Sequence, residues 1–182
     1  MNGLHRPCPA GDGPRPVTAR DALVVKLGGR ALDAPGALSE CVAALREAAG
    51  SARATLLVHG GGAELSAWCA RLGLGPRFAD GLRVTDAATL EVAAAVLAGL
   101  ANKRLVAAMR ARGLDAVGLS LLDGGIAGVR RHEHSATLGE VGEIASVNPS
   151  LLLELLAHGR VPVLASVGDD GQGGLLNLNA DD

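Results

Sequence analysis

The segment TLLVHGGG at residues 55–62 runs from a hydrophobic stretch directly into three consecutive glycines. The residues that follow, AELSAWCARL at 63–72, have the composition of a helix. Upstream, DALVVKLGG at 21–29 repeats the first half of this arrangement, because its β-branched run breaks at Gly28 and Gly29. Continuous apolar runs of this kind are typical of strands that are buried on both faces of a sheet. The two segments therefore predict two buried strands, each ending in a glycine turn.

Strand and helix patterns alternate along the rest of the chain. A β-hairpin is expected over residues 77–84, with Asp80-Gly81 as its two-residue turn. Helical spacing predicts helices at 37–49, 87–112 and 151–158, and apolar runs predict strands at 115–120, 126–131, 143–147, 161–168 and 173–179. This alternation predicts an α/β fold, a three-layer αβα sandwich with a mainly parallel central sheet. Ligands of such sheets bind beyond the carboxyl ends of the strands, where both glycine clusters fall.

The composition excludes several classes of protein. The chain has 182 residues, of which 48% are hydrophobic and 20% charged, so it is not a disordered chain. A formal net charge of −2 argues against a basic nucleic-acid binder, and one Trp, one Phe and no Tyr leave no aromatic platform for single strands. Glycines or charges interrupt the apolar stretches, which predicts no membrane span. We therefore expect neither nucleic acid nor a membrane as a partner.

The N-terminal residues and the cysteines bear on domain organisation and compartment. Residues 1–20 are rich in Pro and Gly and lack the apolar stretch of a signal peptide, so they predict a disordered arm before a domain at 21–182. Cys8, Cys41 and Cys69 are widely spaced and form neither a metal pattern nor a disulfide framework. This cysteine usage fits a reducing compartment and predicts a cytoplasmic protein.

The first glycine cluster has the chemistry of an anion site. Glycines after a strand let a phosphate approach backbone N–H groups, and Lys26 adds a positive charge beside Gly28 and Gly29. The alternative interpretation is a lysine at a strand end followed by a tight turn. Neither the P-loop pattern GxxxxGK[ST] nor the dinucleotide fingerprint GxGxxG occurs in the sequence.

The second cluster, Gly60, Gly61 and Gly62, runs into the N-terminus of the expected helix, which also favours anions. The alternatives are a glycine turn required only for close packing, or the HGGG oxyanion loop of esterases. An esterase also needs a GxSxG nucleophile elbow. Residues 118–122, GLSLL, lack its second glycine, so the esterase interpretation is disfavoured.

Polar residues in two other segments are candidates for binding. Arg83 lies on the return strand of the expected hairpin, where a guanidinium could pair with a carboxylate. In the segment 177–182, NLNADD, alternation places Asn177 and Asp181 on one side of an extended chain. The alternatives are a surface arginine and a polar terminus. His132 and His134 have no third ligand nearby in sequence, so we expect a solvated loop and no metal.

Taken together, these segments resemble the amino-acid kinase family, and within it the acetylglutamate kinases. The motifs that carry the resemblance are VVKLGG at 24–29, LVHGGG at 57–62, GLRVTD at 81–86, LANKR at 100–104 and NLNAD at 177–181. They occur in the order and at the spacing of those enzymes, and the resemblance extends from 21 to 182. Carbamate, aspartate, glutamate 5- and uridylate kinases are the nearest alternatives.

The resemblance implies phosphoryl transfer from ATP, with Mg²⁺, to the side-chain carboxylate of N-acetyl-L-glutamate in arginine biosynthesis. It implies that Lys26 stabilises the phosphoryl group and that Asp181 orients the catalytic lysines. The remaining roles are phosphate binding by Gly28, Gly29 and Gly60 and substrate binding by Gly61, Gly62, Arg83 and Asn177. It also implies a homodimer through the 86–112 helix, although that helix face could instead pack on the sheet.

The resemblance has one large departure. In the family a second lobe binds the nucleotide and supplies another catalytic lysine, and we expect that lobe to be absent from 1–182. Independent kinase activity of these residues is therefore doubtful. A non-catalytic module that binds acyl amino acids is the alternative, and Lys26 favours the enzyme.

Overall fold

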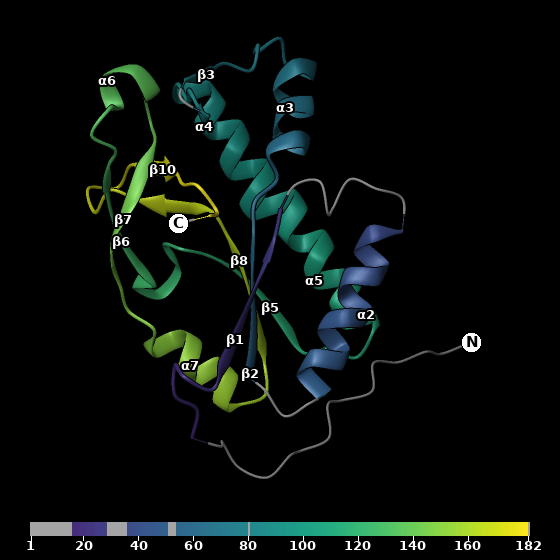
Figure 1. Ribbon diagram of the computed structural model, residues 1–182. Coiled ribbons are helices and arrows are strands. Elements are labelled where there is room, and N and C mark those ends of the chain that lie inside the picture. Colours follow the sequence, from purple (N-terminus) through teal and green to yellow (C-terminus); the bar gives the residue numbers. More distant parts are fainter. Residues whose placement is uncertain (1–15, 29–35, 51–53, 80, 182) are drawn as a thin grey trace.

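The computed structural model describes residues 16–28, 36–50, 54–79 and 81–181 (Figure 1). Most of the expected N-terminal arm lies outside the described residues, as does Gly29. The central sheet has four parallel strands in the order β1-β2-β8-β5. Their bounds are Ala22–Leu27 for β1, Ala54–His59 for β2, Val161–Ala165 for β8 and Ala116–Ser120 for β5. Leu27 is in register with His59, His59 with Ala165, and Ala165 with Ser120, so the strands end at one edge.

Helices cover both faces of this sheet. Helices α2 (Ala37–Gly50) and α5 (Asn102–Ala111) lie on one face and α7 (Ser150–Ala157) lies on the other (Figure 1). The first face buries Leu27, Val42, Leu45, Leu57, Leu105, Met109, Ala116, Val161 and Val163, and the second buries Leu56, Ile126, Leu152, Leu156 and Leu164. The expected αβα sandwich with a mainly parallel sheet is confirmed.

One long helix runs from the hairpin down the first face of the sheet. It consists of α4 (Ala87–Ala93), the π-helical segment η1 (Ala94–Ala101) and α5. It begins at Asp86, whose carboxylate accepts a hydrogen bond from the Thr89 backbone N–H at 2.9 Å. Leu105 is buried in the cluster on the central sheet and Leu97 in a cluster with α3 and Val167, so this face packs within the chain.

The same helix has the length and composition of a possible membrane span. By length and composition alone, the 25 residues of Ala87–Ala111 could cross a membrane, because their most apolar 18-residue window has a mean hydropathy of 1.5. In that window 44% is buried within the fold, so the helix contributes part of its surface to the core. Glu91 and Gly99 interrupt the apolar pattern, as the sequence indicates, without ending the helix.

The expected strand at 161–168 is two strands in two sheets. After β8 the chain bends at Ser166, and β9 (Val167–Asp169) pairs antiparallel with β10 (Leu175–Asn177). An apolar run reports burial but not the identity of the neighbouring strand, so the sequence could not place this break. Gly168 permits the close packing, because a Cβ there would lie 2.8 Å from Val129 Cγ2 and 2.9 Å from Leu178 Cδ1.

Two hairpins and one helix stand above the carboxyl edge of the sheet. The predicted hairpin is confirmed as β3 (Phe78–Ala79) and β4 (Leu82–Arg83), and α3 (Gly62–Arg71) packs beside it against the long helix. The second hairpin joins β6 (Ala127–Arg131) to β7 (Gly142–Val147). A short helix, α6 (Ser135–Leu138), lies where the sequence predicted a polar loop, and a 3₁₀ turn, η2 (Asp123–Gly125), precedes β6.

Candidate functional site

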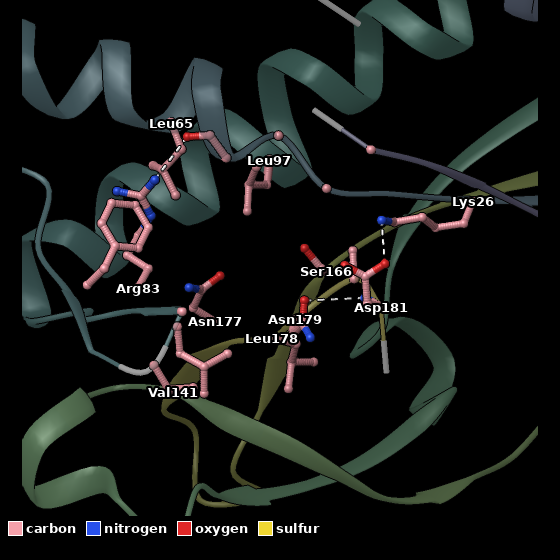
Figure 2. Close-up of a pocket in the computed structure, with 18 residues that line it drawn as sticks. Lys26, Leu65, Arg83, Leu97, Val141, Ser166, Asn177, Leu178, Asn179 and Asp181 are labelled. Atoms are coloured by element: carbon pink, nitrogen blue, oxygen red, sulfur yellow. Dashed lines mark hydrogen bonds and ion pairs between the residues drawn. The ribbon is translucent and has the colours of Figure 1, made fainter. Parts of the chain in front are cut away.

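A cavity of about 230 Å³ lies at the carboxyl edge of the sheet, beneath the β3–β4 hairpin. Figure 2 shows Lys26, Arg83, Asn177 and Asp181 around it, contributed by β1, β4 and the segment 177–181. All of the candidate residues that the structure describes line this one cavity: Lys26, Gly28, Gly60, Gly61, Gly62, Arg83, Asn177 and Asp181. Apolar side chains complete the wall: Leu65, Phe78, Leu82, Leu97, Val141 and Leu178.

The glycine loop forms the floor of the cavity. The Gly60 N–H donates to the Leu27 carbonyl at 3.3 Å, which ties the loop to β1 and leaves that N–H unavailable to a ligand. Gly61 precedes α3 without a side-chain cap, so N–H groups of the first helical turn remain available to an anion. A Cβ at Gly61 would lie 2.7 Å from Leu97 Cδ2, so this position has no space for a larger residue.

Lys26 and Asp181 form an ion pair at the mouth of the cavity (Figure 2). Their side chains are 40% and 67% exposed, so solvent screens the pair and it contributes little to stability. The Lys26 ammonium lies 3.7 Å from the place of a Cβ at Gly28, directly beside the first glycine cluster. The pair therefore holds the Lys26 ammonium next to the Gly28 backbone, which an anion can approach.

Arg83 reaches from the hairpin to the start of α3. Its Nη2 donates to the Gly62 carbonyl at 2.9 Å and to Ser66 Oγ at 2.6 Å, and its guanidinium lies 4.8 Å from the centre of the Phe78 ring. Burial lowers the pKa of Arg83, and Cys69 opposes that shift. Nη1 is buried and has no hydrogen-bond partner among the described residues. An unpaired guanidinium N–H in a cavity wall is a ready donor for a carboxylate.

Asn177 is held in place through Thr85. The Asn177 Nδ2 donates to Thr85 Oγ1 at 3.1 Å, and that hydroxyl donates to the Arg83 carbonyl at 3.1 Å. Thr85 is fully buried, so these bonds connect β10 rigidly to the hairpin strand that carries Arg83. No local pattern in GLRVTD predicts this linking role of Thr85, because the role depends on a buried contact with a residue distant in sequence.

A second polar cluster lies behind the glycine loop. His59 Nδ1 is 2.9 Å from the Gly60 carbonyl, and Nε2 is 3.1 Å from Asn102 Nδ2. Both residues are fully buried. Burial lowers the pKa of His59, while the Gly60 hydrogen bond and the charge of Glu64 partly oppose the shift. Sequence reasoning missed this cluster, although HGGG and LANKR contain two of its members.

The described residues contain no group of three or more His, Cys, Asp or Glu side chains that could hold a metal ion. His132 and His134 lie near each other, with ring centres 5.5 Å apart, on the turn after β6. Neither histidine lines the cavity that holds Lys26 and Arg83.

Comparison with known proteins gives consistent results. The chloroplastic acetylglutamate kinase of Arabidopsis thaliana is 45% identical over 159 residues, which cover 87% of this chain and 46% of the relative. The acetylglutamate kinase of Methanopyrus kandleri is 44% identical over 163 residues, covering 87% and 62% respectively. This chain therefore spans roughly half to three-fifths of the length of these curated relatives.

A solved structure shares the fold. The N-acetylglutamate synthase of Neisseria gonorrhoeae, complexed with coenzyme A and N-acetyl-glutamate, superposes with a TM-score of 0.74 at 25% identity, covering 87% of this chain and 36% of that one. The model of the amino acid kinase family matches residues 21–182, which is nearly the whole chain. The chain therefore belongs to the amino acid kinase family.

Proposed function

We propose that residues 21–182 form the part of an acetylglutamate kinase that binds N-acetyl-L-glutamate. The enzyme would transfer a phosphoryl group from ATP to the side-chain carboxylate of that substrate. The single observation that carries the proposal is the buried, unpaired Nη1 of Arg83 in the same cavity as Lys26. The curated relatives named acetylglutamate kinase support the choice of substrate.

Each lining residue has a role in this proposal. Arg83 pairs with the α-carboxylate, which the reaction leaves unchanged, and Asn177 hydrogen-bonds the substrate from the opposite wall. The N–H groups of Gly61 and Gly62 hold the reacting carboxylate and the moving phosphoryl group. Such transfer involves little covalent chemistry by the protein, so catalysis is positioning and neutralisation of charge. Lys26 neutralises charge that develops during transfer, and Asp181 keeps its ammonium in place.

ATP and Mg²⁺ are the proposed co-substrate and metal. The glycine backbone at Gly28, Gly61 and Gly62, together with Lys26, fits the phosphate end of a nucleotide. Mg²⁺ would supply further positive charge to the phosphates when bound. Because the described residues lack a set of three protein ligands, the nucleotide phosphates would provide most of its coordination. We infer that a second lobe, outside 21–182, holds the nucleotide base.

A non-catalytic binding module is the second candidate. The structural likeness to an N-acetylglutamate synthase favours it, because that enzyme is complexed with N-acetyl-glutamate and is not a kinase by name. The ion pair between Lys26 and Asp181 favours the kinase, because a protein that only binds an amino acid has no need of a phosphoryl-stabilising lysine. The two candidates share the substrate and differ in turnover.

Isothermal titration of the 182-residue chain tests the shared part. We expect N-acetyl-L-glutamate to bind, and N-acetyl-L-glutamine to bind more weakly because it lacks the reacting carboxylate. Absence of any heat with N-acetyl-L-glutamate would overturn both candidates. ADP release with ATP, Mg²⁺ and N-acetyl-L-glutamate in a full-length form then separates them, since the binding module predicts no turnover.

Assembly and compartment are also proposed. A homodimer would have to use the outer face of the long helix, because the inner face is buried within the chain. An apolar groove on that outer face is lined by Trp68 and Leu72 of the α3 region and by Val92, Ala95 and Leu100 of the long helix. Light scattering that finds only monomer at high concentration would reject the dimer.

We propose a cytoplasmic location from the cysteine usage.

A further inference from the structure

Three polar residues behind the glycine loop have no part in the chemistry described above. They are His59 at the end of β2, and Asn102 and Lys103 at the start of α5. They form a continuous chain of hydrogen bonds from the surface of the long helix to the Gly60 carbonyl. Such a buried network is costly unless all of its polar atoms are paired, so it calls for an explanation.

The contacts of His59 define its tautomer. The Gly60 carbonyl can only accept, so Nδ1 must carry the proton and donate to it. The Asn102 amide nitrogen can only donate, so Nε2 must be the unprotonated acceptor. A second proton on the ring would place an N–H against an amide N–H. The imidazole is therefore neutral, with its proton on the side of the glycine loop.

The orientation of Asn102 is fixed in turn by its other neighbours. Its Nδ2 donates to the Val163 carbonyl at 2.9 Å and lies 3.3 Å from the Leu119 carbonyl. Its Oδ1 accepts a hydrogen bond from Lys103 Nζ at 3.1 Å, and that ammonium also donates to the Gly118 carbonyl at 3.3 Å. A flipped amide would face oxygen with oxygen and nitrogen with an ammonium, so the observed orientation is the stable one.

The sheet makes room for this arrangement at Gly118. A Cβ at that position would lie 2.1 Å from Asn102 Oδ1 and 2.8 Å from Lys103 Nζ. Only glycine therefore lets α5 bring its amide and ammonium this close to β5. This fit is a second observation, independent of the hydrogen bonds, that the cluster has one arrangement.

The consequence for the cavity follows from the planarity of the peptide bond. In a trans peptide the C=O and N–H groups point in opposite directions. His59 holds the Gly60 carbonyl on the buried side, so the N–H of the same peptide, which belongs to Gly61, points to the other side. On that other side Gly60 and Gly61 line the cavity. Among the described residues no backbone carbonyl accepts from the Gly61 N–H.

We propose that His59, Asn102 and Lys103 are positioning residues that lock the Gly60–Gly61 peptide, so that the Gly61 N–H is presented to the anionic part of the ligand. The proposal deepens the proposed function and rests on it for the identity of the anion. The orientation of the peptide itself does not depend on that identity.

NMR spectroscopy of the ¹⁵N-labelled 182-residue chain tests the network directly. Ring nitrogen shifts of His59 should show the neutral Nδ1–H tautomer. Asn102→Leu removes the donor to Nε2 and should abolish this fixed tautomer and move the Gly61 amide signal. Because that variant also removes the hydrogen bond from Asn102 to the Val163 carbonyl, Lys103→Met is the milder second variant. It should move the same two signals, and Lys103→Arg should restore them.

Binding provides the functional measurement. One hydrogen bond is worth about 0.5–1.5 kcal/mol, so Lys103→Met should weaken binding of N-acetyl-L-glutamate about two- to tenfold. Arg110→Met is the matched control, because it removes an ion-paired arginine from the same helix, paired with Asp115 at 3.2 Å. It should leave the His59 ring signals, the Gly61 amide and the affinity unchanged.

The outcomes separate this inference from the proposed function. An Nε2–H tautomer, or a Gly61 amide that does not respond to either Asn102→Leu or Lys103→Met, overturns the positioning role even if the substrate binds. Failure of the unmodified chain to bind N-acetyl-L-glutamate, with the tautomer and the Gly61 response as expected, leaves the locked peptide intact and rejects the proposed ligand.

Discussion

The glycine loop separates two polar clusters that differ in how completely their hydrogen bonds are made. On the cavity side, the buried Nη1 of Arg83 has no partner among the described residues, and Lys26 pairs with a solvent-exposed carboxylate. On the buried side, both ring nitrogens of His59 and both polar atoms of Asn102 are paired. An unpaired hydrogen-bonding group is tolerated where a ligand can pair with it, whereas the protein interior tolerates almost no unpaired groups.

The contrast predicts opposite responses to mutation. Substitutions on the cavity side should cost ligand affinity or turnover with little change in the free energy of unfolding. Substitutions on the buried side should cost stability, and they should affect the ligand only through the backbone between the two clusters.

The largest expected effect is that of Arg83→Ala on substrate binding. Removing one partner of a closed charged pair costs about 2–5 kcal/mol, so the Kd for N-acetyl-L-glutamate should rise by at least about 30-fold. In an active form the change should raise KM, because the α-carboxylate is the same in the ground and transition states. Isothermal titration measures the first effect and steady-state kinetics the second.

Arg77→Ala is the control for that substitution. Arg77 lies on the same hairpin segment, 65% exposed, and pairs with Asp86 outside the cavity. Its removal should leave the affinity unchanged. Equal losses of affinity in the two variants would mean that the hairpin matters only as a structure, and Arg83 would lose its assigned role.

Lys26→Ala should act on turnover instead of on affinity. Loss of one preorganised electrostatic donor lowers kcat by about 10²–10³. In a full-length form with ATP, ADP release should fall by that factor, while titration with N-acetyl-L-glutamate should change little. A lysine variant with normal kcat would reject the role of Lys26 in stabilising the phosphoryl group.

Gly61→Ala and Gly62→Ala test the loop between the clusters. A Cβ at Gly61 would lie 2.7 Å from Leu97 Cδ2, whereas a Cβ at Gly62 would meet nothing within 4 Å. Gly61→Ala should therefore lower the free energy of unfolding by about 1–3 kcal/mol, the usual cost of overpacking. Gly62→Ala should leave it unchanged or raise it, because alanine is the better helix former. Urea unfolding of both variants measures these changes. The double variant Gly61→Ala/Leu97→Ala removes the Leu97 side chain that the new Cβ would meet, so it distinguishes a steric cause from other causes.

The smallest effect is the pH dependence that His59 gives to stability. Because the pKa of His59 lies below 6.5 in the folded protein, the unfolded chain takes up the proton first as pH falls. The free energy of unfolding therefore keeps the full contribution of the neutral His59 above pH 6.5. Below that pH the free energy of unfolding falls, by at most about 1.4 kcal/mol per pH unit. Urea unfolding between pH 7.5 and 5.5 measures the slope. His59→Gln should flatten it.

The strands of the parallel sheet and the hairpin were predictable because their signals are local. The β-branched run before Gly28 and the Asp80-Gly81 turn indicate a strand and a hairpin without reference to the rest of the chain. The break at Ser166 was not predictable, because burial is continuous across it and only tertiary pairing separates β8 from β9.

The candidate site shows the same division. Motif resemblance named the residues that line the cavity, and the fold brings the described ones together. The residues that hold them, Thr85, Ser66 and Asn102, act through contacts with partners 17 to 92 positions away in sequence. No spacing rule along one sequence predicts contacts over such separations.

The ion pair at the mouth of the cavity also determines the electrostatics of ligand entry. The charged residues that line the cavity are Lys26, Arg83 and Asp181, which together carry a net charge of +1. The proposed ligand, N-acetyl-L-glutamate, is a dianion, so the cavity with that ligand bound would carry about −1 before any phosphate arrives. Attraction to the empty cavity should weaken as ionic strength rises, because the Debye length shrinks to about 3 Å at 1 M salt. A phosphate donor would then meet a like-charged cavity unless it brought its own cations, because Asp181 offsets one of the two positive charges that line the cavity.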